Sequence, residues 1–237
     1  MLLDADMRQA GATISLADVW PEIVGLMAPD DRQVVRDTLV VPAMYAKGGE
    51  LGTLLATAPS AFDFVIVDGI VLKQTHYAGR DSLELLGPGD VLAPPLTPTR
   101  QAEVRATSTY QAHGRATLAV IEGYFRAAAR RWPQLSDVLH DRLARQTHRA
   151  SAHLAVLHIA RAEDRIRALF SDLAERFGHV TPDGIKIDVD LTHDLIGQLI
   201  GSRRPTVTLA LERLSVANEL TKHHDGRWQL NILDVLQ

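Results

Sequence analysis

LTHDLIGQLIGSRRPTVTLALERLSVANEL, residues 191–220, is the stretch that decides the fold of this chain. Thr192 stands where a helix running to Ile200 would begin, and a threonine hydroxyl at that place accepts a backbone hydrogen bond from the first turn. Gly201 follows where the chain must turn sharply, because glycine enters positive φ without strain. A second helix is predicted from about Arg204 to Val216. Two short helices around a glycine turn predict a helix-turn-helix.

The spacing of small and aliphatic residues in this stretch is typical of that motif. Gly197 lies four residues before Gly201, where the two helices must approach closely, and Val207 lies six residues after it and is expected to face inward. Five more aliphatic side chains are predicted to complete a small core: Ile196, Ile200, Ala210, Leu211 and Leu214.

The residues outside that core suit contact with DNA, because the N-terminal end of the second helix enters the major groove in this motif. The candidate DNA-binding residues here are Thr192, Ser202, Arg203, Arg204, Pro205, Thr206 and Thr208. Arginine can donate to guanine O6 and N7 together, and hydroxyl groups suit phosphate. We expect Arg204 to read a base and Arg203 to hold phosphate. Pro205 fits the first turn of a helix, where no backbone donor is needed.

HHDGRWQL, residues 223–230, predicts a β-hairpin with Asp225-Gly226 at its turn. Such a hairpin forms a wing that would bring Lys222 and Arg227 near the DNA backbone. The alternatives are a winged helical domain used for protein contacts, or an arginine pair that is merely solvated.

Upstream, residues 34 to about 120 predict short strands that form a small roll, barrel or sandwich. The stretches that indicate them are VVRDTLVV (34–41), FDFVIVDGIVLKQTHY (62–77) and SLELLGPGDVL (82–92). VDG (67–69) and YAGRDS (77–82) are both predicted as turns of hairpins. Residues 14–33 predict a short helical segment anchored by Trp20, Ile23, Val24 and Leu26.

From about residue 117 the sequence becomes helical, and residues 134 to 160 predict one long helix because no Pro or Gly interrupts them. Its apolar positions are Leu135, Leu139, Leu143, Ala150, Leu154 and Leu157. This helix can pack on its own domain or pair with its twin in a dimer, and we expect the dimer. A helix over about 161–177 follows, with Gly178 as its C-cap, then a turn at TPDG (181–184) and a strand at IKIDVD (185–190).

Composition narrows the class of protein. The 237 residues include no cysteine, which excludes disulfides, cysteine-ligated clusters and thiol catalysis. The formal net charge is -4, so the DNA-binding prediction rests on the local pattern rather than on overall charge. We expect no signal peptide, no membrane span and a cytoplasmic location.

Over nearly its full length the chain resembles the cyclic-AMP receptor protein/FNR (Crp/Fnr) family of bacterial regulators. The segments that carry the resemblance are VDGIVL (67–72), GPGDVL (87–92), LAERFG (173–178) and LTHDLIGQLIGSRRPTVTLALERL (191–214). It implies an α+β fold with an N-terminal cyclic-nucleotide-binding-like β-roll (1–133), a long dimerisation helix (134–160) and a C-terminal winged helix-turn-helix (161–237). It also implies a homodimer on palindromic double-stranded DNA that contacts RNA polymerase or blocks it.

Two parts of the chain depart from the family pattern. Arg204 matches the family's base-reading arginine, but Pro205 stands where glutamate is common and Leu209 where a second arginine is common. The DNA target is therefore expected to differ from the family's best-known site.

The effector site implied by the resemblance comprises Gly87, Gly89, Asp90, Arg100 and Gln101. The family's Gly-Glu pair is replaced by Ala93-Pro94, so the ribose of a cyclic nucleotide would lose an acceptor. We therefore expect a regulator that does not depend on cyclic AMP and has no cofactor. A response to cyclic nucleotide, to haem or to an unidentified small molecule is the alternative. The histidines available for haem have no diagnostic spacing: His76, His113, His140, His148, His153 and His158.

Two other classes compete with a transcription regulator. A β-roll that binds a metal or ligand, or acts as an enzyme, needs clustered ligands, and the roll offers only His76 and His113, far apart and without an H-x-H pair. We therefore expect no metal and no catalysis. An architectural DNA-binding protein with a vestigial sensor would share the helix-turn-helix. Genome-wide occupancy would separate it from a regulator.

Overall fold

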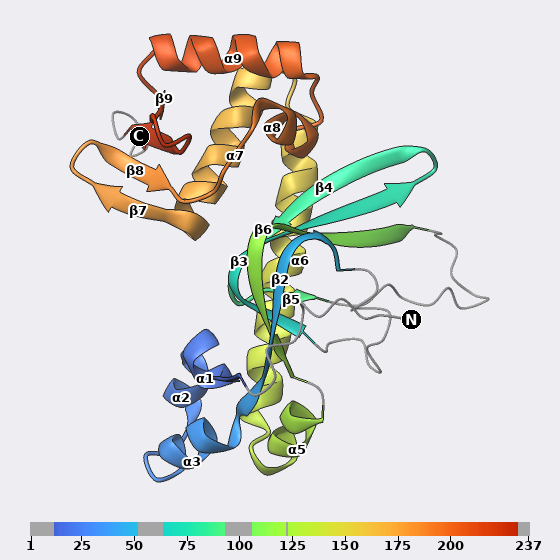
Figure 1. Ribbon diagram of the computed structural model, residues 1–237, viewed down its shortest axis with the longest axis vertical. Helices are drawn as coiled ribbons and strands as arrows, with labels where there is room; N and C mark the ends of the chain where they lie inside the picture. The colour runs from blue at the N-terminus through green and yellow to red at the C-terminus, as the bar shows by residue number, and fades with distance from the viewer. Residues whose placement is uncertain (1–11, 52–63, 93–105, 122, 232–237) are drawn as a thin grey trace. The chain divides into compact units, whose positions relative to one another are not determined.

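The computed structural model describes residues 12–51, 64–92, 106–121 and 123–231 (Figure 1). The chain divides into two compact units, Met1–His148 and Arg149–Gln237. The boundary falls inside the long helix α6 (Gln134–Leu157), which covers most of the 134–160 helix predicted from the sequence.

Unit 1 begins with β1 (Thr13–Ser15) and the short helices α1 (Leu16–Val19), α2 (Glu22–Leu26) and α3 (Asp31–Thr38). Trp20 and Ile23 are buried as expected, but Leu26 is 52% exposed and is not an anchor. The strand predicted at 34–41 is wrong over residues 34–38, which are helical. Val35 alone packs into the core there, while the charged neighbours of the two valines face solvent. Packing therefore overrides the β preference of the valines.

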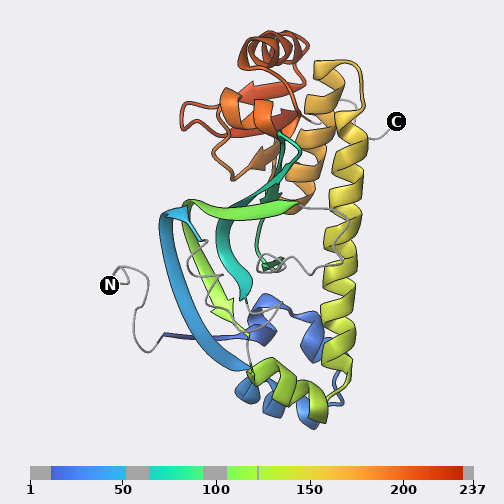
Figure 2. The same cartoon turned by 90° about the vertical axis from the view of Figure 1, so that its right-hand side faces the viewer.

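The strands of the roll are β2 (Val40–Glu50), β3 (Phe64–Tyr77), β4 (Arg80–Leu86), β5 (Val91–Leu92) and β6 (Thr107–Val120). The described strands form an antiparallel sheet in the order β1-β2-β6-β3-β4, with β5 on β3. Figure 2 shows β2 and β6 curving along the roll. Since β6 reaches Val120, the helical region predicted from about 117 starts only at α5 (Tyr124–Arg131).

The predicted turn at 67–69 is wrong: β3 continues through it as one strand. The register against β6 shifts on both sides of Gly69, which has φ +84°. A Cβ on Gly69 would lie 2.1 Å from the carbonyl oxygen of Arg115, so the glycine permits a β-bulge rather than a hairpin. The second predicted turn is confirmed, with Ala78 and Gly79 at positive φ between β3 and β4.

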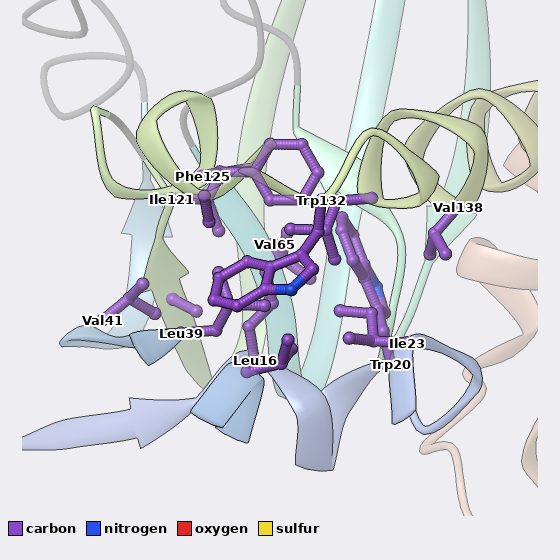
Figure 3. Packing of buried hydrophobic residues seen from close by; sticks show 14 of the residues in the cluster. Leu16, Trp20, Ile23, Leu39, Val41, Val65, Ile121, Phe125, Trp132 and Val138 are labelled. Carbon is purple, nitrogen blue, oxygen red and sulfur yellow. The ribbon is translucent and has the colours of Figure 1, made fainter. Parts of the chain in front are cut away.

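Unit 1 has two apolar clusters. One fills the roll, with Phe64, Ile66, Leu92, Tyr110 and Leu118 among its members. The other lies where α1–α3, α5 and the start of α6 gather at one end of the roll (Figures 1 and 2). Within it Trp20 and Phe125 meet edge to face, with ring centroids 6.0 Å apart, beside Trp132 (Figure 3).

Unit 2 contains α7 (Ala162–Phe177), β7 (Gly178–Thr181), β8 (Gly184–Ile187), α8 (His193–Leu199), α9 (Arg204–Val216), β9 (Leu220–Lys222) and β10 (Trp228–Asn231). Its sheet has the order β7-β8-β10-β9. Phe170 of α7 packs edge to face on Trp228 of β10 at 5.5 Å, and the Trp228 indole donates to the carbonyl of Leu191. Helix and sheet thus share one core.

Gly178 follows α7 as predicted, but not in the left-handed conformation of a glycine C-cap, because its φ is -88° and it begins β7. Its lack of a side chain serves close packing instead. A Cβ there would lie 2.2 Å from the carbonyl oxygen of Ala174 and 2.4 Å from Cγ2 of Ile185.

Candidate DNA interface

The turn between α8 and α9 is built as the sequence predicts. Thr192 caps α8 by accepting a hydrogen bond from the Leu195 N–H at 3.1 Å. Gly201 has φ +62°, and the Ser202 N–H donates to the carbonyl of Gly197 at 2.8 Å. A Cβ on Gly197 would lie 2.6 Å from the Ser202 carbonyl oxygen, so the close approach expected at Gly197 is to the turn itself.

Helix α9 packs on this turn through the predicted core. Val207 is fully buried, and every other member of the set is at most 3% exposed: Ile196, Ile200, Ala210, Leu211 and Leu214. The inward face of α9 is therefore set by apolar burial, which leaves its N-terminal residues outside.

Four of the predicted DNA-binding residues are exposed at that N-terminal end: Arg203, Arg204, Pro205 and Thr206. Arg203 occupies the N-cap position without capping the helix through its side chain, and Arg204 is the first helical residue. Nη1 of Arg204 lies 3.4 Å from Oδ2 of Asp194, and both side chains are more than half exposed. Water screens such a pair, so it holds the arginine only weakly.

Two of the hydroxyl groups predicted to bind phosphate, those of Ser202 and Thr208, already make hydrogen bonds inside unit 2. Ser202 Oγ accepts from Nη2 of Arg165 at 2.8 Å. Thr208 Oγ1 shares a hydrogen bond of 2.9 Å with Nδ1 of His193. Each hydroxyl keeps capacity for a second partner, but its position is set by the protein. The roles of Arg165 and His193 could not be predicted from the sequence, because no local pattern links residues 37 and 15 positions apart.

Charges of both signs surround His193, and the cations act on it more strongly than the carboxylates of Asp194 and Glu212. Burial lowers the pKa of His193, and the positive charges of Lys222 and Arg204 lower it further. Cations from the wing and from α9 therefore act on the same ring. A polyanion is attracted to such a surface.

The predicted wing is confirmed as the hairpin of β9 and β10. The His223 N–H donates to the Arg227 carbonyl at 2.8 Å, Gly226 has φ +82°, and Asp225 accepts from the Arg227 N–H. Arg227 also lies 3.2 Å from Asp188, and Lys222 stacks on the Trp228 ring at 5.2 Å. Arg227 would have to break its ion pair with Asp188 to bind a DNA phosphate. Lys222, by contrast, lies against the Trp228 ring.

Ion pairs join α7 to α9 and to Glu219, the residue before β9. Arg167 of α7 donates to both carboxylate oxygens of Glu219, at 2.6 and 2.8 Å, and lowers the pKa of Glu219. Arg213 of α9 pairs with Glu163 at 2.6 Å. Both pairs therefore link α7 to the C-terminal part of α9 and to the residue that precedes β9.

The predicted effector residues Gly87, Gly89 and Asp90 form a tight turn between β4 and β5. The Asp90 carboxylate is buried and accepts from the Gly87 N–H at 2.9 Å. Gly89 has φ +84°, and its carbonyl accepts from the indole of Trp20 at 3.1 Å. All three residues therefore shape the turn. Arg100 and Gln101 lie outside the described residues, as do Ala93 and Pro94.

Helix α6 contacts that turn directly. The Gln146 side chain donates to the Val91 carbonyl and accepts from the Val91 N–H, both at 3.2 Å. Arg142 donates to both carboxylate oxygens of Glu22, at 2.5 and 2.9 Å. These contacts join residues 55 and 120 positions apart, so the sequence carried no signal for them.

The histidines do not assemble a metal site in the described ranges. His76 pairs with Asp81 at 2.6 Å on the β3–β4 hairpin. No cluster of three or more His, Asp or Glu side chains suited to a metal ion occurs in the parts of the chain that the structure describes. Within the same ranges, no helix has the length and apolar character needed to cross a membrane.

A β-roll, a long helix and a winged helix-turn-helix with exposed arginines define a DNA-binding regulator of the two-domain kind. No family model matches the sequence. The regulatory protein CysR of Synechococcus elongatus is 29% identical over 160 residues, which cover 65% of this chain and 69% of CysR. A CRP-like cAMP-activated global transcriptional regulator of Mycobacterium tuberculosis is 36% identical over 90 residues, which cover 36% of this chain and 40% of that regulator.

A transcriptional regulator of the CRP/FNR family from Thermus thermophilus has the same fold, with a TM-score of 0.54 at 19% identity over 79% of this chain and 92% of that one. The chain is thus similar to transcription regulators of the CRP/FNR type, and the α+β fold predicted for it is confirmed.

Proposed function

We propose that the protein binds promoter DNA as a homodimer at palindromic sites and does so without cyclic AMP. The observation that carries the proposal is the N-terminal end of α9, where Arg203, Arg204, Pro205 and Thr206 stand exposed above a closed helix-turn-helix core. An arginine at this place can reach guanine in the major groove. Such a protein acts in the cytoplasm and has no catalytic role.

Helix α6 supports the dimer. Leu135 and Val138, near the start of α6, are buried in unit 1, whereas Leu154, three residues before the end of the helix, is 56% exposed. A second copy of the helix would cover such a leucine. Light scattering at micromolar concentration tests this proposal: we expect twice the mass of the chain, and a monomer would refute it. Leu154→Glu should shift the equilibrium toward monomer, while the equally exposed Tyr124→Glu should not.

Independence from cyclic AMP is supported by two features. Ala93-Pro94 lacks the carboxylate that a ribose hydroxyl needs. Gln146 and Arg142 already tie α6 to unit 1 through side chains of the protein. The test is selection of bound sequences from random duplex DNA, with and without cyclic AMP. We expect the same palindrome in both, with half-sites about one helical turn apart. Enrichment only with cyclic AMP would refute independence.

Contact with RNA polymerase, by which the protein would activate or block transcription, completes the proposal. An architectural role is the competing function, since it needs the same DNA-binding domain. Chromatin immunoprecipitation separates the two: discrete promoter peaks support the regulator, and dense coverage with weak sequence preference supports architecture.

The roles of the two arginines can be separated. Arg204→Ala should relax the preference at one position of each half-site and weaken binding to the preferred sequence by about 1–3 kcal/mol for each half-site. Arg203→Ala should weaken binding to all sequences alike and reduce its salt dependence. An unchanged sequence preference in the Arg204 variant would refute the assignment.

A further inference from the structure

The outward face of α9 carries three apolar residues and one acidic residue. At 100° per residue, the buried side chains Val207, Ala210, Leu211 and Leu214 share one side of the helix. The positions on the opposite side are Pro205, Leu209, Glu212 and Val216. Leu209 is 49% exposed and Val216 is 90% exposed. A leucine in the middle of the recognition helix therefore points away from the core.

The charges around Leu209 indicate what covers it. Arg203 and Arg204 stand exposed at the start of the same helix, and Lys222 extends from the wing. Both Arg204 and Lys222 act on His193, whose ring is bonded to Thr208, the neighbour of Leu209. Glu212, three residues further on, is the acidic neighbour of Leu209, and the three cations outnumber it. An apolar side chain near several cations suits a partner with an anionic backbone and an apolar group between its strands.

Thymine offers that apolar group. In the major groove it alone among the bases presents a methyl, next to its O4 acceptor, whereas cytosine and adenine present amino donors there. A leucine side chain has no polar atom to accept a hydrogen bond. Placed against the amino group of cytosine or adenine, it would displace the water that the amino group binds and leave that donor unpaired. Placed against the thymine methyl, the leucine excludes water without leaving any hydrogen-bond donor unpaired.

We propose that Leu209 is a specificity-determining residue that reads the 5-methyl group of a thymine in each half-site. This inference rests on the proposed function. Leu209 lies five residues beyond Arg204, or about 7.5 Å along the helix axis. The thymine is therefore expected about two base pairs from the base that Arg204 reads. Val216, at the far end of α9, lies too far from the N-terminal end to share the role.

The experiment uses the full-length protein and the palindrome obtained by selection. Each thymine is replaced in turn by deoxyuridine, in both half-sites, which removes only the methyl group. Binding is measured by fluorescence anisotropy at one salt concentration for wild type, Leu209→Ala and Val216→Ala. Burial of one methyl predicts about a fourfold weaker Kd per half-site, or about fifteenfold per palindrome.

We expect one thymine to show this penalty with wild type and with Val216→Ala, and Leu209→Ala to bind both duplexes equally. The Leu209 variant should remain folded, because the side chain lies outside the core. A half-site without thymine within reach, or deoxyuridine binding within twofold of thymine everywhere, would overturn the inference. The same holds if Leu209→Ala keeps the full penalty, which would assign the methyl to Thr206 or another residue. If Leu209→Ala leaves DNA binding unchanged but abolishes binding to a protein partner, the inference is overturned and this face of α9 contacts protein.

Failure of the proposed function gives a different result. In that case wild-type protein enriches no sequence at all, and both proposals fall together. Enrichment of a palindrome without methyl dependence removes only the inference about Leu209.

Discussion

The turn between α8 and α9 makes a sharp prediction at Gly197. This glycine lies within α8, where alanine is the better helix former and should by itself stabilise the helix by about 1 kcal/mol. The structure predicts the opposite sign for Gly197→Ala. The new Cβ would stand 2.6 Å from the carbonyl oxygen of Ser202, well inside the 3.4 Å at which ordinary contact begins.

The size of the effect follows from what must move. Crowding in a well-packed site costs about 1–3 kcal/mol, and the upper part of that range applies because the obstacle is a backbone carbonyl that cannot rotate away. Offset by the gain in helix propensity, a net loss of about 2 kcal/mol is expected, or roughly a 30-fold shift in the folding equilibrium. Ser202 leads directly into α9, so its displacement should also weaken DNA binding.

Urea unfolding of wild type and variant, followed by circular dichroism and by tryptophan fluorescence, measures the loss. Gly25→Ala is the matched control, since Gly25 also lies in a helix but has nothing within 4 Å of its Cβ position. That control should be neutral or slightly stabilising. If Gly197→Ala is as stable as wild type and binds DNA equally well, the close approach of α8 and the turn has no energetic weight and the reasoning fails.

Three further substitutions test single contacts. Arg167→Gln should lower stability by about 1 kcal/mol or less. Arg167 lowers the pKa of Glu219 in the folded protein. The stability that this ion pair contributes should therefore be complete above the unfolded-state pKa of Glu219 and disappear as the pH falls through the lowered pKa. A stability difference between wild type and variant that persists in acid would contradict this. Gln146→Leu removes the side-chain amide that bonds both the N–H and the carbonyl of buried Val91, which should cost about 1–3 kcal/mol of stability. Hydrogen exchange at the Val91 amide should accelerate, and unchanged protection would show that the contact is dispensable. Thr192→Ala should cost about 1 kcal/mol in thermal unfolding through the lost helix cap, and Thr192→Ser should restore it.

The helix-turn-helix could be predicted from the sequence because all of its signals are local. A capping hydroxyl at Thr192, a glycine at positive φ and a core at helical spacing lie within some 25 residues, and each acts on its nearest neighbours in the chain. The wing could be predicted for the same reason, since Asp225 and Gly226 form the turn of the hairpin through contacts with their immediate neighbours.

Predictions from local residue preference were wrong where tertiary packing favoured a different backbone conformation. Val34 and Val35 favour a strand, yet α3 forms because Val35 finds a place in the core beneath the roll. The turn predicted at Gly69 became a bulge because the strand that carries Arg115 approaches it closely. Neither outcome is visible without the neighbouring element.

The sequence by itself determined the class of fold, the recognition helix and the residues exposed at its N-terminal end, since periodicity and capping chemistry act over a few residues. Only the tertiary structure decided how those residues are held. Arg165 reaches Ser202 from another helix, and Gln146 meets Val91 across unit 1. Such contacts depend on the path of the whole chain, because side chains meet in space according to how their elements pack and not according to their separation in sequence.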